Sequence, residues 1–486
     1  MDASRRPQPP KHDSRCRFRP FAAALLPLLL TVCCGSHAAA ERPRVGEVAL
    51  HNTGAAEAQA DFLAGLAALH SFWYEEARDL FQRAQEIDSG FALAYWGEAM
   101  THYHPIWRST SPSAGRAALD DLDAEAGDRL RRYGTGVEQA LVDAARHLFE
   151  DGDRAFSESL AEARSEFPDN TEIAVFYALS LQGRAAGPGR RSAEDHRLIA
   201  ESAALLEELF ERHPRHPGVL HYLIHAVDDP ANAHRGLEAA DLYSEIAPDS
   251  SHALHMPTHI YLQVGDWDGV VEMNRRAWEA SERWVERKDL PLWKKDYHAL
   301  SWLHYGLLQQ GDFAGAAGVL ETLRTNGGGL AGSEARFTAR HLIETEEWDF
   351  ELPDSDRDEV RFARAFAAAK RGRTEEAREA LDSFSGTGDT DEILRHELEG
   401  LLAFVTGRSE RAVASLARAA GLESETRIPT GPPDLLKPAL ELQGEVLLEL
   451  GDCEEARRAF ERSLERMPNR RLSVRGERRA AACSTG

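Results

Sequence analysis

Two short stretches of the sequence concentrate residues that can bind a metal ion. The stretch HYLIHAVDDP begins at His221 and the stretch HALHMPTHIYLQ begins at His252, and together they hold seven candidate ligands: His221, His225, Asp228, Asp229, His252, His255 and His259. Within each stretch the histidines are three or four residues apart, a spacing that places side chains on one face of a helix. Such imidazoles can bind a divalent transition metal such as zinc, and carboxylates can complete the ligand set.

A second interpretation of these residues stays open. Histidine and aspartate side chains also form purely structural networks, in which they bond to each other and cap helix ends. The chain contains no HExxH motif, so the general base of the usual zinc proteases is missing. It also contains no GxSxG, GxxxxGK[ST] or strand-coupled GxGxxG motif. The histidines are therefore the only indication of catalysis in the sequence, and whether the protein is an enzyme stays open.

Helical phrases of one form surround these stretches. Each is a turn followed by an amphipathic helix with small or apolar residues three and four positions apart, as in GDWDGVVEMNRRAWEA, GDFAGAAGVLETL, GRTEEAREALDSF and GDCEEARRAFERSLERMP. Runs of β-branched residues are few. A recurring unit of this kind predicts an array of helical hairpins, in which chain length is not limited by the size of one core.

The first and last units resemble tetratricopeptide repeats. The last unit has a glycine, an alanine, an aromatic, a small residue and a proline at the family's spacing: Gly444, Ala456, Phe460, Ser463 and Pro468. The first unit repeats this pattern with Gly65, Ala77, Phe81 and Ala84. A small residue lets two helices cross closely, and proline ends a helix because it lacks an N–H group. The resemblance implies an all-α fold, a right-handed α-solenoid of tetratricopeptide-like helical hairpins.

Longer phrases resemble a particular group within this family. AYWGEAMTHYHPIW, HPGVLHYLIHAVDD, HALHMPTHIYLQ and GPPDLLKPALELQGE are similar to phrases of secreted bacterial tetratricopeptide proteins. This resemblance implies export and the solenoid fold, and it implies no reaction.

The family resemblance also gives a register for the groove. In tetratricopeptide arrays the first helix of each hairpin lines a concave groove, and Pro214 and Pro248 lie one 34-residue period apart. This phase places all seven candidate ligands on the groove face of two adjacent helices. We therefore expect His221 and His225 to face His255 and His259, with imidazole nitrogens within about 5 Å of each other and Asp228 or Asp229 in reach.

The same register marks a second set of candidates. It places Arg336, Arg340 and Glu344 on the groove wall, where two arginines one turn apart can hold a carboxylate or phosphate. The alternative is an exposed helix on which Arg340 pairs with Glu344. In an aromatic-rich segment upstream, His104 is a further ligand-binding candidate, although aromatic residues at helical spacing are typical of a core. His298 is a minor candidate.

The first forty residues have the features of an export signal. Six basic residues precede the apolar run FAAALLPLLLTVCC, and Ala38, Ala39 and Ala40 fit a cleavage site. Lipidation at Cys33 or Cys34 is the alternative, but Val32 is a poor match to the small residue that precedes a lipidated cysteine. We expect a signal peptide at 1–40, a flexible segment at 41–55, tetratricopeptide-like arrays at 56–283 and 284–470, and a capping helix and tail at 471–486.

Charge and cysteine content restrict the partners and the compartment. The formal net charge of −24 argues against nucleic acid, whose phosphates attract Lys and Arg. No segment after the signal has the roughly 18 apolar residues of a membrane span. Cys453 and Cys483 are the two cysteines outside the signal, and we expect them to form a disulfide in an oxidising compartment.

Two hypotheses follow from these observations. The first is an exported periplasmic or extracellular binding or scaffold protein that recognises a protein, peptide or small anionic ligand in its groove. The alternative is a metal-binding protein, such as a metal-dependent hydrolase, that uses the five histidines.

Overall fold

A computed structural model describes residues 42–486, apart from residues 123, 188–190, 327–332, 383–387 and 484–486. Every regular element in this described part is a helix, which confirms the all-α class. Arg42–Gly486 forms one compact unit. The predicted signal peptide, residues 1–40, lies outside the described residues.

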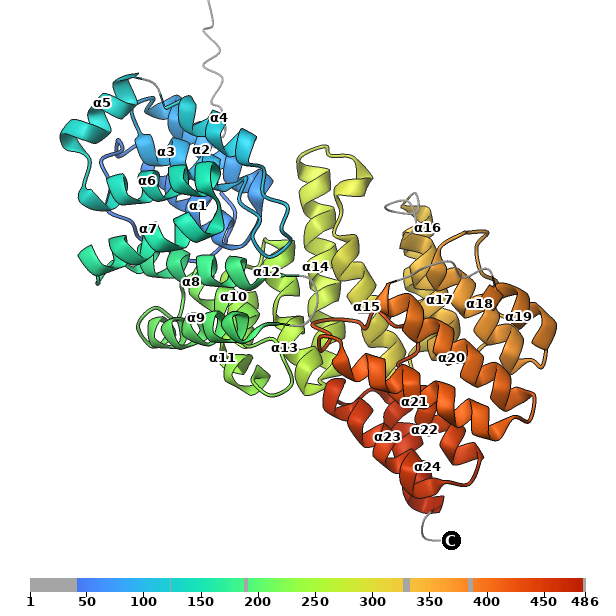
Figure 1. Ribbon diagram of the computed structural model, residues 1–486. Helices are drawn as coiled ribbons and strands as arrows, with labels where there is room; N and C mark the ends of the chain where they lie inside the picture. Colours follow the sequence, from blue (N-terminus) through green and yellow to red (C-terminus); the bar gives the residue numbers. More distant parts are fainter. Residues whose placement is uncertain (1–41, 123, 188–190, 327–332, 383–387, 484–486) are drawn as a thin grey trace, which may run out of the picture. The chain divides into compact units, whose positions relative to one another are not determined.

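The helices follow one another along the chain (Figure 1). The N-terminal ones are α1 (Gln59–His70), α2 (Tyr74–Ile87), α3 (Ala92–Met100), α4 (Pro112–Asp120), α5 (Ala124–Tyr133), α6 (Gly136–Asp151), α7 (Asp153–Glu166), α8 (Thr171–Ala185), α9 (Ala193–Arg212), α10 (Pro217–Ala226), η1 (Ala233–Gly236), α11 (Leu237–Ile246), α12 (Ser251–His255), α13 (Pro257–Val264) and α14 (Trp267–Arg287). The C-terminal ones are η2 (Leu292–Lys294), α15 (Tyr297–Gln310), α16 (Phe313–Thr325), α17 (Ser333–Thr345), α18 (Asp358–Lys370), α19 (Thr374–Asp382), α20 (Asp389–Val405), α21 (Ser409–Glu425), α22 (Ala439–Glu449), α23 (Cys453–Arg466) and α24 (Arg471–Cys483).

Neighbouring helices in the sequence pack on each other as hairpins. The pairs α1 with α2, α8 with α9, α14 with α15, α20 with α21 and α22 with α23 make some of the most extensive contacts. Short connections bring consecutive amphipathic faces together, so each hairpin buries its apolar side against the next. The structure therefore confirms the predicted array of helical hairpins.

Gly-Asp dipeptides build several of the tight turns inside these hairpins. Gly265 and Gly311 end their helices in the left-handed conformation, with φ of 73° and 80°. Glycine adopts this conformation without steric cost. The aspartate that follows each glycine then caps the next helix: Asp266 accepts a hydrogen bond from the backbone N–H of Gly269, and Asp312 accepts one from Gly315. Such caps contribute about 1 kcal/mol each.

The glycines of the repeat pattern lie against aromatic rings. A Cβ atom at Gly65 would stand 3.0 Å from the ring of Phe81, and one at Gly444 would stand 2.9 Å from the ring of Phe460. Because the rings fill the space that a side chain would need, these positions require glycine. This close contact between glycine and ring explains why a glycine and an aromatic residue recur at a fixed separation in the sequence.

The segment that precedes the first helix contacts the helical core. Val45 and Leu50 are buried, and the Arg42 guanidinium donates to the Asp61 carboxylate over 2.8 Å. Arg44 pairs with Asp249 in the same way. Two apolar anchors and two ion pairs hold residues 42 to 55 in place, although they form no helix.

The C-terminal end is closed as the sequence predicts. Helix α24 packs on α23, and Cys453 at the start of α23 forms a disulfide with Cys483 at the end of α24. The bond closes a loop with a sequence separation of 30 residues.

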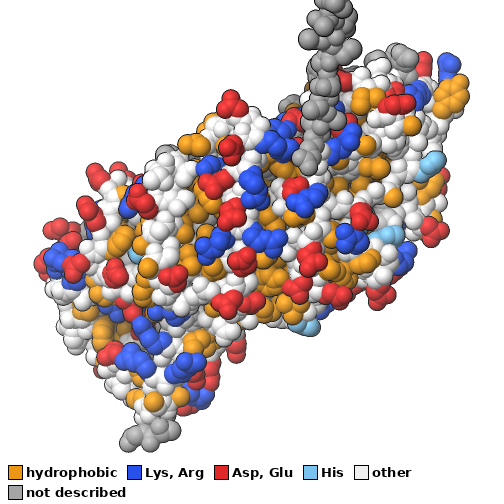
Figure 2. All heavy atoms as spheres, turned by 180° about the vertical axis from the view of Figure 1, so that it is seen from behind, with side chains coloured by type: hydrophobic (Ala, Val, Ile, Leu, Met, Phe, Trp, Pro, Cys, Tyr) orange, Lys and Arg blue, Asp and Glu red, His pale blue; other side chains and the backbone are white. Residues whose placement is uncertain are grey.

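The surface of the described chain mixes both charges. On the face in Figure 2, acidic and basic side chains alternate, with hydrophobic side chains between them. Such a face has no continuous basic stripe of the kind that nucleic acids require. None of the helices among the described residues has the length and apolar character to cross a membrane.

Candidate metal centre

Four helices bring six histidines together. Helix α10 carries His221 and His225, the α12–α13 segment carries His252, His255 and His259, and α15 carries His298. Pro257 divides the second stretch into two short helices, because proline cannot continue the hydrogen bonding of α12. Met256, which joins them, keeps helical angles with φ of −55° and ψ of −39°. The three histidines of this segment therefore stay in the predicted helical spacing.

The six histidines form two groups of three. In each group, one nitrogen from each ring lies within 4.8 Å of the others: His221, His225 and His252 in cluster A, and His255, His259 and His298 in cluster B. Sequence spacing predicted a single set of five from two helices. The structure instead turns His252 towards α10, and it adds His298 from α15 to His255 and His259.

Cluster A has the closest approach between two imidazoles. The Nε2 atoms of His221 and His252 are 3.2 Å apart and form a hydrogen bond. Tetrahedral coordination with bonds of about 2.0–2.1 Å separates two ligand nitrogens by about 3.3 Å. The ring of His225 lies 4.9 Å from that of His221, between centroids. The spacing therefore fits two ligands on adjacent corners of a tetrahedron.

Hydrogen bonds at Nδ1 orient three of the rings. The Nδ1 atom of His221 lies 2.6 Å from the backbone carbonyl oxygen of His70, so it carries the proton and donates. The Nδ1 atom of His255 bonds to Oδ1 of Asn274 over 2.7 Å, and that of His259 bonds to Oδ2 of Asp228 over 2.8 Å. A neutral imidazole that donates from Nδ1 has its lone pair on Nε2. This is the pattern by which proteins orient metal-binding histidines.

Each cluster contains a buried nitrogen without a hydrogen-bond partner. Among the described residues, Nε2 of His225 in cluster A and Nε2 of His255 in cluster B contact no donor or acceptor. A buried polar group left in this state costs about 1–3 kcal/mol. A purely structural network would satisfy these atoms, whereas a metal site leaves them free for the ion.

Burial keeps four of the imidazoles neutral. It lowers the pKa of His221, His225, His252 and His255 well below the usual range, and neighbouring histidines lower these pKa values further. Neutral imidazole is the form that binds a metal ion. These four rings are therefore neutral at neutral pH and have a nitrogen lone pair that can bind an ion.

The two clusters adjoin each other. The ring centroids of His225 and His259 are 5.8 Å apart, and those of His252 and His255 are 6.1 Å apart. Trp302 of α15 packs over cluster B, with its ring 4.5 Å from that of His259. The six imidazoles thus form one continuous centre with an aromatic wall.

Phe72 covers cluster A from an unusual backbone conformation. Its ring lies 4.3 Å from His221, 6.0 Å from His225 and 5.7 Å from His252. With φ of 51°, Phe72 occupies the left-handed conformation that glycine adopts in the Gly-Asp turns. A non-glycine residue there costs about 1–2 kcal/mol. Strain of this size collects at functional sites.

A third group of possible ligands is a satisfied structural network. Glu172 bonds to Nε2 of His70 over 2.8 Å and to Nε2 of His216 over 2.9 Å, and all three side chains are buried. The Tyr222 hydroxyl contacts Nδ1 of His70. Although burial opposes it, the two imidazoles hold the pKa of Glu172 well below its usual range. These residues fix α1, α8 and α10 behind cluster A.

The two aspartates of the first stretch have separate roles. Asp228 is buried and accepts hydrogen bonds from His259 and, over 3.0 Å, from Nε2 of Gln263. Asp229 accepts from the backbone N–H groups of Ala231 and Asn232 and shapes a turn. Asp228 therefore supports a cluster B ligand, and Asp229 is engaged outside both clusters.

The other predicted site residues do not belong to the two histidine clusters. His104 stacks on Tyr74 with 4.0 Å between ring centroids, and its Nε2 donates to the carbonyl of Thr101 over 2.9 Å. Glu344 accepts from Arg470 over 2.7 Å, whereas the buried Arg340 donates to the carbonyl of Pro433. Arg336 and Arg340 line a cavity of about 920 Å³.

This cavity opens onto cluster B. His259, His298 and Trp302 form part of its wall. The opposite wall includes residues of the segment 426–438 between α21 and α22, which we call the cavity loop. Gln263 joins the two sides, because its Nε2 donates both to Asp228 and, over 2.9 Å, to the carbonyl of Pro429.

His298 is the ligand candidate that sequence reasoning valued least. The sequence does indicate that His298 has the same position in its helix as His252. Each histidine follows by two residues a side chain that caps the helix, Ser250 or Asp296. The role of Phe72 also has a signal, since LHSFWYEEA lacks the glycine and aspartate that other hairpins have at this turn.

Comparison with known proteins gives a limited result. No protein-family model matches the chain, and no curated protein matches it. Solved structures that match include yeast Tom70 (12% identity, 88% of this chain and 89% of that one, TM-score 0.31) and a human IFIT1 dimer with m7Gppp-AAAA (12%, 88% and 90%, TM-score 0.38). The P58(IPK) TPR domain also matches (12%, 88% and 99%, TM-score 0.25). TM-scores this low support no inference about function.

Proposed function

We propose that this protein binds two divalent transition-metal ions, one in cluster A and one in cluster B. The observation that carries the proposal is the pair of buried, unpartnered Nε2 atoms of His225 and His255. Each belongs to a set of three imidazoles whose nitrogens lie within 4.8 Å of one another. Imidazole ligands suit zinc and copper, and three of them leave one coordination position open.

The hydrogen bonds behind the imidazoles add a second line of support. His221, His255 and His259 each use Nδ1 on an oxygen acceptor, which directs Nε2 towards the centre of its cluster. The acceptors are a backbone carbonyl, an amide and a carboxylate, the groups that support metal-binding histidines. The chemistry of the residues present therefore fits a divalent ion.

Metal content of untagged protein tests this proposal. After dialysis against zinc or copper and removal of free ion, we expect two equivalents by mass spectrometry of the metal. His225→Ala and His255→Ala should each reduce the content to about one equivalent, because each removes a ligand from a different cluster. His104→Ala serves as the control outside both clusters and should retain two equivalents. Wild-type protein that binds no ion would refute the proposal.

A metal-dependent hydrolase is a second candidate. The cavity beside His259 and His298 favours it, because an ion held by three imidazoles has a position open for water, whose pKa such an ion lowers to about 7. Release of p-nitrophenol from p-nitrophenyl acetate and p-nitrophenyl phosphate is the assay. Activity that depends on metal and is lost in His298→Ala would support hydrolysis, and equal rates with and without metal would reject it.

Partner recognition by an exported protein is the third candidate. The helical-hairpin array offers a surface built from many repeats, and the disulfide between Cys453 and Cys483 favours an oxidising, periplasmic or extracellular location. Affinity capture from the envelope of the producing cell, with a cytoplasmic extract as control, tests this candidate. A protein or peptide retained specifically by the full chain would support it.

A further inference from the structure

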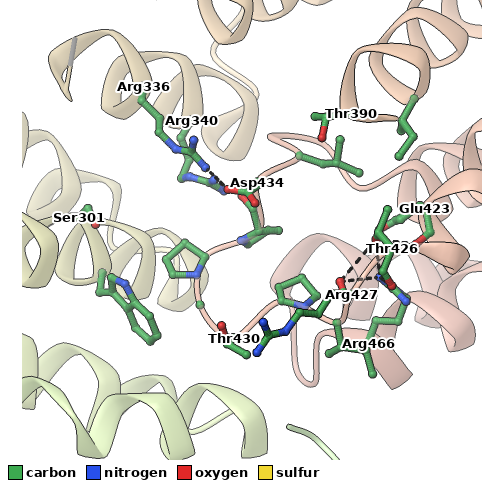
Figure 3. Close-up of a pocket in the computed structure, with 18 of the residues that line it drawn as sticks. Ser301, Arg336, Arg340, Thr390, Glu423, Thr426, Arg427, Thr430, Asp434 and Arg466 are labelled. Carbon is green, nitrogen blue, oxygen red and sulfur yellow. Dashed lines mark hydrogen bonds and ion pairs between the residues drawn. The ribbon is translucent and has the colours of Figure 1, made fainter. Parts of the chain in front are cut away.

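The cavity next to cluster B has walls from six helices and one loop. Helices α13, α15, α17, α20, α21 and α23 contribute residues to it, and the cavity loop crosses it. In Figure 3, Arg336 and Arg340 project from α17, whereas Arg427, Thr430 and Asp434 come from the cavity loop. A volume of about 920 Å³ is within the range of small-molecule sites.

Much of the lining is apolar. Trp302, Phe337, Ile393, Leu422 and Leu435 face the cavity, and prolines of the cavity loop add to this surface. Aromatic and aliphatic walls favour the apolar body of an organic molecule.

Four arginines also line the cavity, in a protein whose formal net charge is −24. Arg336 is neutralised by Asp434, with 2.9 Å between its Nη2 and the carboxylate. Arg340, Arg427 and Arg466 are different, because each has donors that the described residues do not satisfy. These three guanidinium groups are the ones available to a ligand.

Arg340 carries the strongest indication. It is 4% exposed, its Nη2 donates to the carbonyl of Pro433, and among the described residues its Nη1 is buried without a partner. Burial lowers the pKa of Arg340 to about 10, so the group stays charged at neutral pH. A buried cation with an unused donor requires an acceptor.

Arg466 and Arg427 stand at the other side of the cavity. Arg466 donates from Nη2 to Thr426, while its buried Nε has no partner among the described residues. Arg427 is exposed and forms no ion pair with an acid in the described part of the chain. Glu423 also lines the cavity, where burial raises its pKa and its side chain accepts a hydrogen bond from the N–H of Leu440.

We infer that this cavity binds an organic anion, whose apolar body packs on Trp302 and Phe337 and whose carboxylate or phosphate group accepts hydrogen bonds from Arg340, Arg427 or Arg466. The inference deepens the proposed function and rests on it for one point, namely that the bound molecule lies beside the ion of cluster B. The cavity reaches His259 and His298, so no further opening is needed for that contact.

The test uses three small aromatic probes and the full chain. Phenylacetate and phenyl phosphate carry the two candidate acidic groups, and 2-phenylethanol is the neutral control. Binding is followed by calorimetry, first on protein treated with a chelator and then on protein loaded with zinc. We expect one or both anions to bind at least about tenfold more tightly than the alcohol, because a charged hydrogen bond contributes about 1.5–3 kcal/mol.

Three variants locate the site. Arg427→Gln alters an exposed side chain and should fold normally, and Arg340→Met preserves the length of a buried one. Each should weaken anion binding about tenfold or more, whereas Arg462→Gln, exposed on α23 and outside the cavity lining, should leave it unchanged. Equal binding of the alcohol and the anions, or an equal effect of Arg462→Gln, would overturn the inference.

The two proposals fail in different ways. Anion binding that depends on Arg427 in protein that takes up no metal would refute the metal site and preserve the anion site. Two equivalents of metal in a protein that does not distinguish phenylacetate or phenyl phosphate from 2-phenylethanol would refute the anion site alone. A gain in anion affinity on zinc loading that is absent in His298→Ala would place the molecule beside cluster B.

Discussion

The Nδ1 atom of His259 lies 2.8 Å from Oδ2 of Asp228, at the point where α13 faces the end of α10. A carboxylate at this distance fixes the tautomer of the ring and makes Nε2 a better donor to an ion. Asp228 is 6% exposed, so water cannot easily replace it in this role.

Substitution of Asp228 by Asn should therefore weaken metal binding at cluster B. The amide keeps the shape of the side chain but removes the negative charge, and losses of this kind are about 10–100-fold in metal affinity. Competition with a chromophoric chelator measures the change. Asp229→Asn is the matched control, because Asp229 shapes a turn outside the clusters, and its metal affinity should equal that of wild type. Equal losses in both variants would contradict the role of Asp228.

The metal-free protein should lose stability as the pH falls from 7 to 5. Burial lowers the pKa of His221, His225, His252 and His255, so these rings stay neutral in the folded state while the unfolded chain takes up protons below about pH 6.5. Each proton taken up only by the unfolded chain reduces the free energy of unfolding by about 1.4 kcal/mol per pH unit. Urea unfolding in the presence of a chelator measures this slope.

A double variant separates this effect from that of carboxylates. His225→Ala/His252→Ala removes two of the four rings and should flatten the slope between pH 5 and 7. The lowered pKa of Glu172 changes the stability only below the ordinary pKa of a glutamate, near pH 4. This lies outside the range from pH 5 to 7. An unchanged slope in the double variant would show that the buried histidines are not its source.

Glu397→Gln should stabilise the protein at alkaline pH. Glu397 is fully buried, neither of its carboxyl oxygens has a partner among the described residues, and burial raises its pKa well above the usual range. The folded state thus retains a proton that the unfolded chain releases above about pH 4.5, so wild-type stability falls as pH rises. The variant's free energy of unfolding is compared with that of wild type by urea unfolding at both pH values. We expect this difference to favour the variant by about 1–3 kcal/mol more at pH 8 than at pH 5. A variant that is less stable at both values would contradict the assignment.

Loss of the disulfide should destabilise the C-terminal end. On the chain-entropy account, a loop of this length contributes about 3–4 kcal/mol. Cys453→Ser/Cys483→Ser should therefore unfold at lower urea concentration, and its α23–α24 region should exchange amide hydrogens faster. Titration of the unfolded, unreduced wild type should find neither Cys453 nor Cys483 as a free thiol. Two free thiols in protein from an oxidising compartment would refute the bond.

The sequence predicted the helical array and the spacing of histidines within a helix, because both follow from local periodicity. It did not predict the division of the histidines into two clusters. That division depends on the angle between α10 and the α12–α13 segment and on the arrival of His298 from α15, which spacing along the chain does not contain. The groove register predicted from the sequence for Arg336 and Arg340 stays a prediction, whereas the cavity that they line also includes the cavity loop, which is distant in sequence.

The role of Phe72 also depends on contacts between residues that are distant in the sequence. Its turn has phenylalanine in the left-handed conformation that glycine adopts at Gly265, Gly311 and Gly451, and this difference is visible in the sequence. Its cause is visible only in three dimensions, where the ring lies against three imidazoles that come from residues 221 to 252.

The Gln263 side chain would make the proposed metal affinity and the proposed cavity occupancy thermodynamically dependent on each other. One amide group holds both the carboxylate behind His259 and the carbonyl of Pro429 in the cavity loop. Any molecule that displaces the loop on entering the cavity also changes the support of a cluster B ligand. By linkage, the factor by which such a molecule changes affinity for the ion equals the factor by which the ion changes affinity for the molecule. If cluster B holds the proposed ion, its retention would depend on what the cavity contains.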